Sequence, residues 1–150
     1  MKARNFLIVL CLFCTSAVFA QNKMFEKYAD MDDVTSVFIS KAMFQMMPEI
    51  ENVGVNLMNM KGKIESLQLV SSDKKEKIAQ MKKDFSQLVT SQHQELMRVK
   101  DNDSRITFYS NMKGDQIKEL IMLIDSEDTF MAMLLVGNFT LKDIQEIVDK

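Results

Sequence analysis

Two apolar runs in the C-terminal third of the chain constrain its fold more than any other feature. Residues 120–124 and 130–136 contain no polar side chain, and the polar residues 125–128 separate the runs. Gly137 and Asn138 follow the second run. Short apolar runs bounded by turn-forming residues are typical of strands buried on both faces, although periodicity alone also allows helix. We therefore predict that residues 117–124 and 130–136 form a β-hairpin at the centre of a sheet.

The first 20 residues have the pattern of a secretory signal peptide. Lys2 and Arg4 precede an apolar run at residues 6–13, and Val18-Phe19-Ala20 provides a cleavage site. The apolar stretch is shorter than the roughly 20 residues needed to cross a bilayer. We expect residues 1–20 to be removed, leaving residues 21–150 in the periplasm or on the cell surface, with no transmembrane segment.

Both cysteines, Cys11 and Cys14, lie within this predicted signal peptide. Leu10 and Phe13 precede them, and both are larger than the small residue that precedes a lipid-attachment cysteine, which argues against a lipid anchor. After cleavage at Ala20 the protein contains no cysteine. The exported protein must then fold without disulfides.

Residues 21–150 have the size of a single domain, and one proline and four glycines in the whole chain leave no room for a flexible linker. Loss of Lys2 and Arg4 would make the formal net charge of −2 more negative. An acidic domain is a poor candidate for nucleic-acid binding or for docking onto anionic lipid.

In the first half of this domain, β-branched and alternating stretches predict strands, and stretches with helical spacing predict helices. Ser40 is a candidate N-cap, and Pro48 limits the helix that follows it. The expected elements are a helix at residues 22–29, a strand at 34–39, a helix at 41–47, a loop at 52–63 and a half-buried strand at 64–70.

The longest predicted element is an amphipathic helix of roughly 24 residues. It would begin with a capping box formed by Asp73 and Glu76. Its apolar positions have helical spacing: Ile78, Met81, Phe85, Leu88, Val89, Leu96 and Met97. Lysines fill the remaining face, which we interpret as solvated; the alternative is a docking surface for an acidic partner, made by Lys74, Lys75, Lys82 and Lys83.

The C-terminal part completes the predicted fold. A strand at residues 105–110 leads into the central hairpin, and a helix capped by Thr140 and Asp143 ends the chain. The sequence therefore predicts an α+β fold: a mainly antiparallel sheet with a C-terminal three-strand meander, and helices packed on one face, including the long helix. A parallel α/β sheet is the alternative.

Catalytic motifs are absent from the sequence. It has no nucleophile elbow, phosphate-binding glycine loop or zinc-protease motif, and its single histidine, His93, excludes metal sites that need two imidazoles. We interpret His93 as a surface or boundary residue. The acidic clusters at residues 30–33 and 125–128 are interpreted as solvated turns, with calcium ligation as the alternative. No cofactor is predicted.

Methionine is unusually frequent, with 14 in 150 residues. Unbranched methionines fill irregular cores, which is our main interpretation. A cluster near the middle of the chain offers two alternatives, an adaptable apolar binding surface or a copper(I) site. Its members are Met43, Met46, Met47, Met58 and Met60.

Four segments resemble a known bacterial family. They are FEKYA at residues 25–29, VFISKAM at 37–43, KELIML at 118–123 and LVGNFTLKDI at 135–144. Together they resemble the family called domain of unknown function 4252, small exported proteins of which some are lipoproteins. The chain departs from the lipoprotein members because it lacks a well-formed lipid-attachment cysteine. The resemblance implies no activity, substrate or site residue.

Three functions remain, in this order. The first is a non-enzymatic binding module of the bacterial cell envelope, which takes an envelope protein or a small apolar ligand. The second is a small extracytoplasmic enzyme that uses carboxylates or His93, and it requires Asp32, His93 and Asp128 to converge. The third is a methionine-based protein that responds to copper(I) or oxidants.

Overall fold

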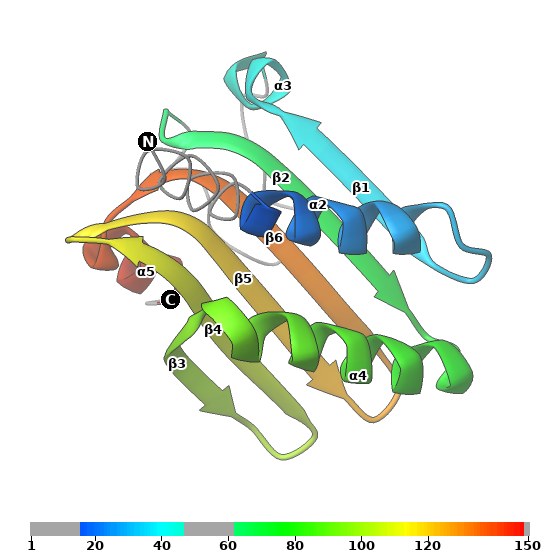
Figure 1. Ribbon diagram of the computed structural model, residues 1–150. Coiled ribbons are helices and arrows are strands. Elements are labelled where there is room, and N and C mark those ends of the chain that lie inside the picture. The colour runs from blue at the N-terminus through cyan, green and yellow to red at the C-terminus, as the bar shows by residue number, and fades with distance from the viewer. Residues whose placement is uncertain (1–15, 47–61, 149–150) are drawn as a thin grey trace, which may run out of the picture.

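The computed structural model describes residues 16–46 and 62–148, which form one six-stranded sheet with helices beside it (Figure 1). Every strand pair is antiparallel, and the strand order is β1-β2-β6-β5-β4-β3. The α+β prediction is confirmed, and the parallel alternative is wrong. The strands are β1 (Thr35–Ser40), β2 (Ile64–Ser72), β3 (Gln94–Lys100), β4 (Ser104–Lys113), β5 (Gln116–Ser126) and β6 (Phe130–Phe139). The helices are α2 (Ser16–Ala29), α3 (Lys41–Met46), α4 (Lys75–Gln92) and α5 (Leu141–Val148).

The predicted central hairpin is confirmed as β5 and β6. These strands pair with each other and are flanked by β4 and β2, so both are interior strands. The Ser126 hydroxyl closes their turn by donating to the Thr129 carbonyl at 2.9 Å. The predicted end of the second strand at residue 136 is wrong, because β6 continues through Gly137 and Asn138 to Phe139.

Two hydrophobic cores lie on opposite faces of the sheet, because neighbouring residues of a strand point to opposite sides. Along β2, Leu69 belongs to one core and Val70 to the other. Helices α2 and α4 cover the face of Val70 with Phe25, Tyr28 and Phe85 (Figure 1). The face of Leu69 contains Phe44 of α3 and Ile144 of α5. The prediction that all helices pack on one face is therefore wrong. The central strands are apolar on both sides, so both sides attract helices.

The predicted helix of roughly 24 residues was too long, mainly at its C-terminal end. Helix α4 ends at Gln92, and the segment assigned to its last turns is strand β3, which pairs with β4. Charged and apolar residues alternate at the end of β3, and cross-strand hydrogen bonding outweighed the helical spacing of Leu96 and Met97. The C-terminal region therefore holds four consecutive strands where three were predicted.

The two predicted capping boxes have different outcomes. At α5, the Asp143 carboxylate accepts from the Thr140 backbone N–H at 2.8 Å, and the Thr140 hydroxyl accepts from the Asp143 N–H at 3.3 Å. This box is confirmed. At α4 the N-cap is Lys74 and makes no side-chain cap, so the box of Asp73 and Glu76 is wrong. The Ser72 hydroxyl instead accepts from the Lys74 N–H at 3.2 Å.

Asp84 links α4 to α2. Its carboxylate accepts a hydrogen bond from the Tyr28 hydroxyl at 2.7 Å and another from the Lys27 ammonium at 2.9 Å. The bond from Tyr28, followed by that from Lys27, lowers the pKa of Asp84 below its ordinary value of 3.8. Burial, together with the same hydrogen bond to Asp84, raises the pKa of Tyr28. Ionised Asp84 therefore stabilises the packing of α2 on α4.

This link predicts a specific pH dependence. A carboxylate whose pKa is lower in the folded than in the unfolded protein stabilises the fold at pH values above its unfolded pKa. This stabilisation is lost as the pH falls through its folded pKa. We expect the free energy of unfolding of Asp84→Asn to decrease less than that of wild type as the pH falls below about 4. Urea unfolding across this range measures the effect. The exposed Asp115→Asn is the control, and equal acid sensitivity of Asp84→Asn and wild type would contradict the assignment.

Candidate functional site

The methionines divide into buried and exposed groups. Met81, Met122 and Met133 are buried in the two cores, which confirms core packing as the role of these three. Met43 and Met46 are exposed on α3, with exposed fractions of 50% and 78%. Met47, Met58 and Met60 lie outside the described residues, so a surface or copper site that includes them stays a prediction.

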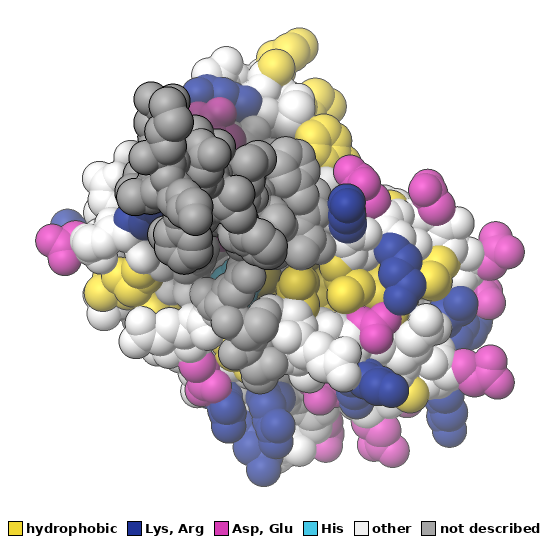
Figure 2. Space-filling view, in the orientation of Figure 1, with side chains coloured by type: hydrophobic (Ala, Val, Ile, Leu, Met, Phe, Trp, Pro, Cys, Tyr) yellow, Lys and Arg dark blue, Asp and Glu magenta, His cyan; other side chains and the backbone are white. Residues whose placement is uncertain are grey.

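The exposed methionines lie next to an apolar sheet edge. Strand β1 is the first strand of the sheet, and its Val37 and Phe38 are 42% and 64% exposed. Hydrophobic side chains gather over α3 and the adjoining end of β1 in Figure 2. We call Val37, Phe38, Met43 and Met46 the β1 surface. The sequence pointed to its two methionines but not to Val37 and Phe38.

The two edges of the sheet differ in their protection against strand pairing. Natural edge strands are commonly protected by charges, prolines or bulges. The opposite edge, β3, carries Glu95, Arg98 and Lys100 and has a register shift against β4. Strand β1 has the sequence TSVFIS, with no charge or proline, and it pairs with β2 in unbroken register. The absence of charged residues in this strand is the sequence signal that could have indicated β1 as a binding edge.

A small apolar depression joins the β1 surface to the helix layer. Its volume is about 70 Å³, and it lies between α2 and the first two strands. The lining residues include Phe25 and Ala29 from α2, and Val37, Phe38 and Leu69 from the strands. A side chain from an added segment could therefore contact both β1 and α2.

The four lysines of the predicted docking surface, Lys74 before α4 and Lys75, Lys82 and Lys83 in it, differ in their surroundings, and the docking surface stays a prediction. Lys82 makes an ion pair with Asp125 of β5 at 2.6 Å, whereas Lys74 lies 3.4 Å from its neighbour Asp73. Lys83 contributes to the field that lowers the pKa of Asp84. Lys75 is exposed in the first turn. Lys82 also lines a cavity.

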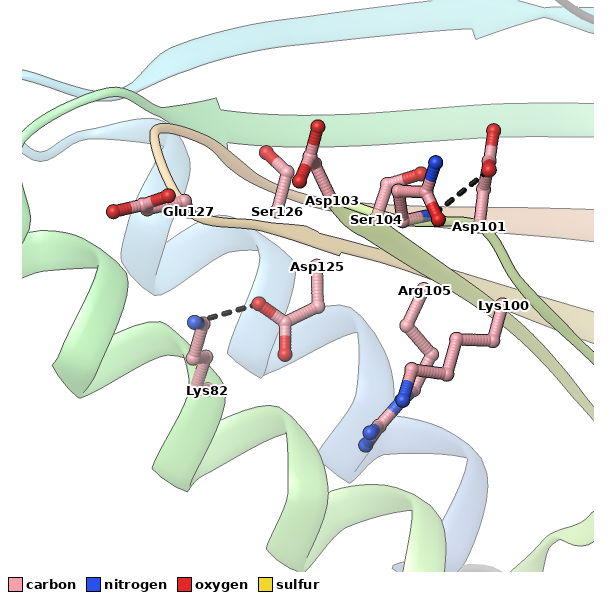
Figure 3. A pocket seen from close by; sticks show the side chains of 10 residues that line it. Lys82, Lys100, Asp101, Asp103, Ser104, Arg105, Asp125, Ser126 and Glu127 are labelled. Atoms are coloured by element: carbon pink, nitrogen blue, oxygen red, sulfur yellow. Dashed lines mark hydrogen bonds and ion pairs between the residues drawn. The ribbon is translucent and has the colours of Figure 1, made fainter.

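That cavity is a cleft between α4 and the β3–β5 end of the sheet (Figure 3). Its outer part has a volume of about 330 Å³ and its inner part about 110 Å³. Both parts share Lys82, Arg105 and Asp125. Arg98, Lys100 and Arg105 were not predicted from the sequence, although the last two flank the turn-forming residues 101–104. Basic residues on both sides of a hairpin turn were the available signal.

The grouping of Asp32, His93 and Asp128 that an enzyme would require does not form. Asp32 and Asp128 lie near the end of the sheet where Ser72 of β2 pairs with Phe130 of β6, next to the start of α4. His93 is at the other end of that 18-residue helix, about 27 Å away along its axis. There the His93 side chain is buried, and its Nε2 is 3.9 Å from the Glu119 carboxylate. The residue as a whole is half-buried, which agrees with the predicted boundary position, although its imidazole is buried.

Within residues 16–46 and 62–148, no cluster of three or more histidine, cysteine, aspartate or glutamate side chains could hold a metal ion. Within the same residues, none of the helices combines the length and apolar character required to cross a membrane.

Comparison with known proteins gives one match. A family model described as "Domain of unknown function (DUF4252)" matches residues 28–147. No curated protein and no solved structure matches the chain. The matched region contains all six strands and thus both the β1 surface and the cleft.

Proposed function

Because the chain belongs to the family described as domain of unknown function (DUF4252), a description that assigns no activity, we propose its function from the β1 surface. The protein is an exported, non-enzymatic binding module of the bacterial cell envelope. It binds an extended segment of an envelope protein, which adds to the sheet as a further strand beside β1. The observation that carries this proposal is the uncharged, unbulged edge strand with exposed Val37 and Phe38.

Strand addition fits this edge physically. The outer side of an edge strand presents N–H and C=O groups that an added strand can pair, and alternate side chains provide specificity. Val37 and Phe38 point to opposite faces, since they are neighbours in the strand. An apolar residue of the incoming strand can therefore be buried on each face. Met43 and Met46 add adaptable apolar contact beside it.

Export is part of the proposal. Cleavage after Ala20 retains residues 21–29 of α2, with the buried Phe25 and Tyr28 that hold this helix to the core. The released protein would therefore keep the helix that borders the apolar depression. Residues 21–150 then form a single α+β domain. N-terminal sequencing of the protein recovered from the envelope should begin at Gln21, whereas an intact Met1 would contradict export by this signal.

Affinity capture from the envelope fraction of the host tests the binding surface. We expect one reproducible partner with the wild-type protein and its loss with Val37→Lys, because a charge at this edge prevents apolar burial. Val99→Lys is the matched control, since Val99 is a 39% exposed residue of the opposite edge strand. Loss of the partner with both variants, or with Val99→Lys alone, would place binding elsewhere and contradict the proposal.

A further inference from the structure

The inner part of the cleft has an excess of positive charge, because Lys82, Arg98 and Arg105 line it and Asp125 is its acidic residue. Lys82 is paired with Asp125 at 2.6 Å, and Arg98 is paired with Glu95 at 2.6 Å. Lys100 and Arg105 make no ion pair or side-chain hydrogen bond with any other residue that the structure describes. Among the described residues, Lys100 and Arg105 are therefore cations of the cleft that no ion pair neutralises.

These two cations are direct neighbours. Lys100 and Arg105 are opposite each other in the β3–β4 register, so their side chains share one face of the sheet. Figure 3 shows them running in parallel, with their cationic ends together on the side of α4. Like charges at directly opposed positions destabilise a strand pair. An anion between them would remove this cost.

The inner part of the cleft provides matching surroundings for an anionic group. Arg98, Arg105 and Lys82 line it together with the hydroxyl-bearing Thr107 and Tyr109, and Thr107 is buried. Leu123 and Phe130 supply an apolar wall. The strand register explains this set, because Thr107 lies between Arg98 and Leu123, and Arg105 lies between Lys100 and Asp125.

We propose that this cleft is a binding site for a small ligand with a carboxylate or phosphate group. The Arg105 guanidinium donates two parallel hydrogen bonds to the oxyanion, and Lys100 contributes a further charge-assisted bond. The inner volume of about 110 Å³ fits a small apolar body, and the oxyanion lies at Arg105, where the inner part meets the outer part that Lys100 lines. The outer cleft carries Asp101, Asp103 and Glu127, which would repel an extended acidic peptide. This site is separate from the β1 surface and does not depend on strand addition.

Binding can be measured by calorimetry and by amide chemical shifts of the purified protein, with inorganic phosphate and benzoate as probes at matched ionic strength. Phosphate and carboxylate recognition are thereby distinguished. We expect shifts confined to α4 and β3–β5, and an affinity about 10- to 100-fold weaker in Arg105→Gln, as loss of a charge-assisted hydrogen bond implies. Lys113→Gln, an exposed cation elsewhere on β4, should bind like the wild type.

Two further variants distinguish binding at this site from nonspecific attraction of anions to the protein surface. Asp125→Asn removes the acidic group that is opposite Arg105 and paired with Lys82, and it should bind the anion more tightly than wild type. Lys100→Gln should bind it more weakly, yet have a melting temperature equal to or above that of wild type without ligand, because it removes a like-charge pair. Equal affinity in Arg105→Gln and wild type, no response to either probe, or binding of a glutamate-rich peptide alone would overturn the proposal.

Discussion

Replacing Phe85 with alanine is expected to lower the free energy of unfolding by about 3–5 kcal/mol, the range for removal of a buried phenylalanine. Phe85 has 0% exposure, and its ring lies 5.1 Å from that of Phe25, 5.6 Å from that of Tyr28 and 6.1 Å from that of Phe130. These partners belong to α2 and β6. The cavity left by removal of the Phe85 ring would therefore weaken the packing of α2 and α4 on the sheet. A loss of this size is a large fraction of the stability of a small domain.

Chemical denaturation of wild type and Phe85→Ala measures this difference. Val99→Ala is the control, because it shortens an apolar side chain that is 39% exposed and should change stability by only a few tenths of a kcal/mol. If both variants had similar unfolding free energies, the core between α2, α4 and β6 would not be assembled as described.

Gly137→Ala is expected to have the second large effect, a destabilisation of about 1–3 kcal/mol from overpacking. A Cβ atom here would clash with the Lys63 carbonyl oxygen and approach the Phe139 ring to 2.6 Å. That carbonyl accepts a hydrogen bond from the Asn138 N–H at 3.0 Å, and Gly137 is opposite Ile64 in the β2–β6 register. The backbone therefore cannot retreat without losing the pairing of two interior strands.

Gly62→Ala is the matched control for this effect. Nothing lies within 4 Å of the position that its Cβ would occupy. We expect Gly62→Ala to be as stable as wild type or slightly more stable, because alanine restricts the unfolded chain. Thermal melting of both variants provides the comparison. A melting temperature for Gly137→Ala at or above that of Gly62→Ala would show that β2 and β6 do not approach each other as described.

The sequence predicted the parts of the fold that depend on local pattern. Uninterrupted apolar runs identified the interior strands β5 and β6, and the reciprocal Thr140–Asp143 cap identified the start of α5. It failed where local and long-range preferences compete. Leu96 and Met97 have helical spacing relative to Val89, but hydrogen bonding of β3 to β4 decided their structure. The strand conformation of Leu96 and Met97 depends on tertiary pairing, which local sequence pattern does not reveal.

The candidate functional surfaces were likewise predictable only where they depend on local sequence pattern. Methionine content pointed to Met43 and Met46, which are exposed, whereas the role of Val37 and Phe38 depends on β1 being an edge strand. Strand order is set by long-range pairing, and the sequence did not establish it. The cleft likewise forms only because α4 and the β3–β4 hairpin are adjacent in the fold. Lys82 could therefore be predicted as a binding residue from the sequence, whereas Arg105 could not.

Photocrosslinking in the host envelope tests the central claim most directly, because it reports which edge of the sheet touches a partner. A photoreactive phenylalanine analogue would replace Phe38 on β1 or, as the control, Val99 on β3. Strand addition beside β1 predicts a discrete crosslinked species from position 38, which disappears when Val37→Lys is added, and none from position 99. A crosslink from position 99 alone, or one from position 38 that persists with Val37→Lys, would contradict binding at β1.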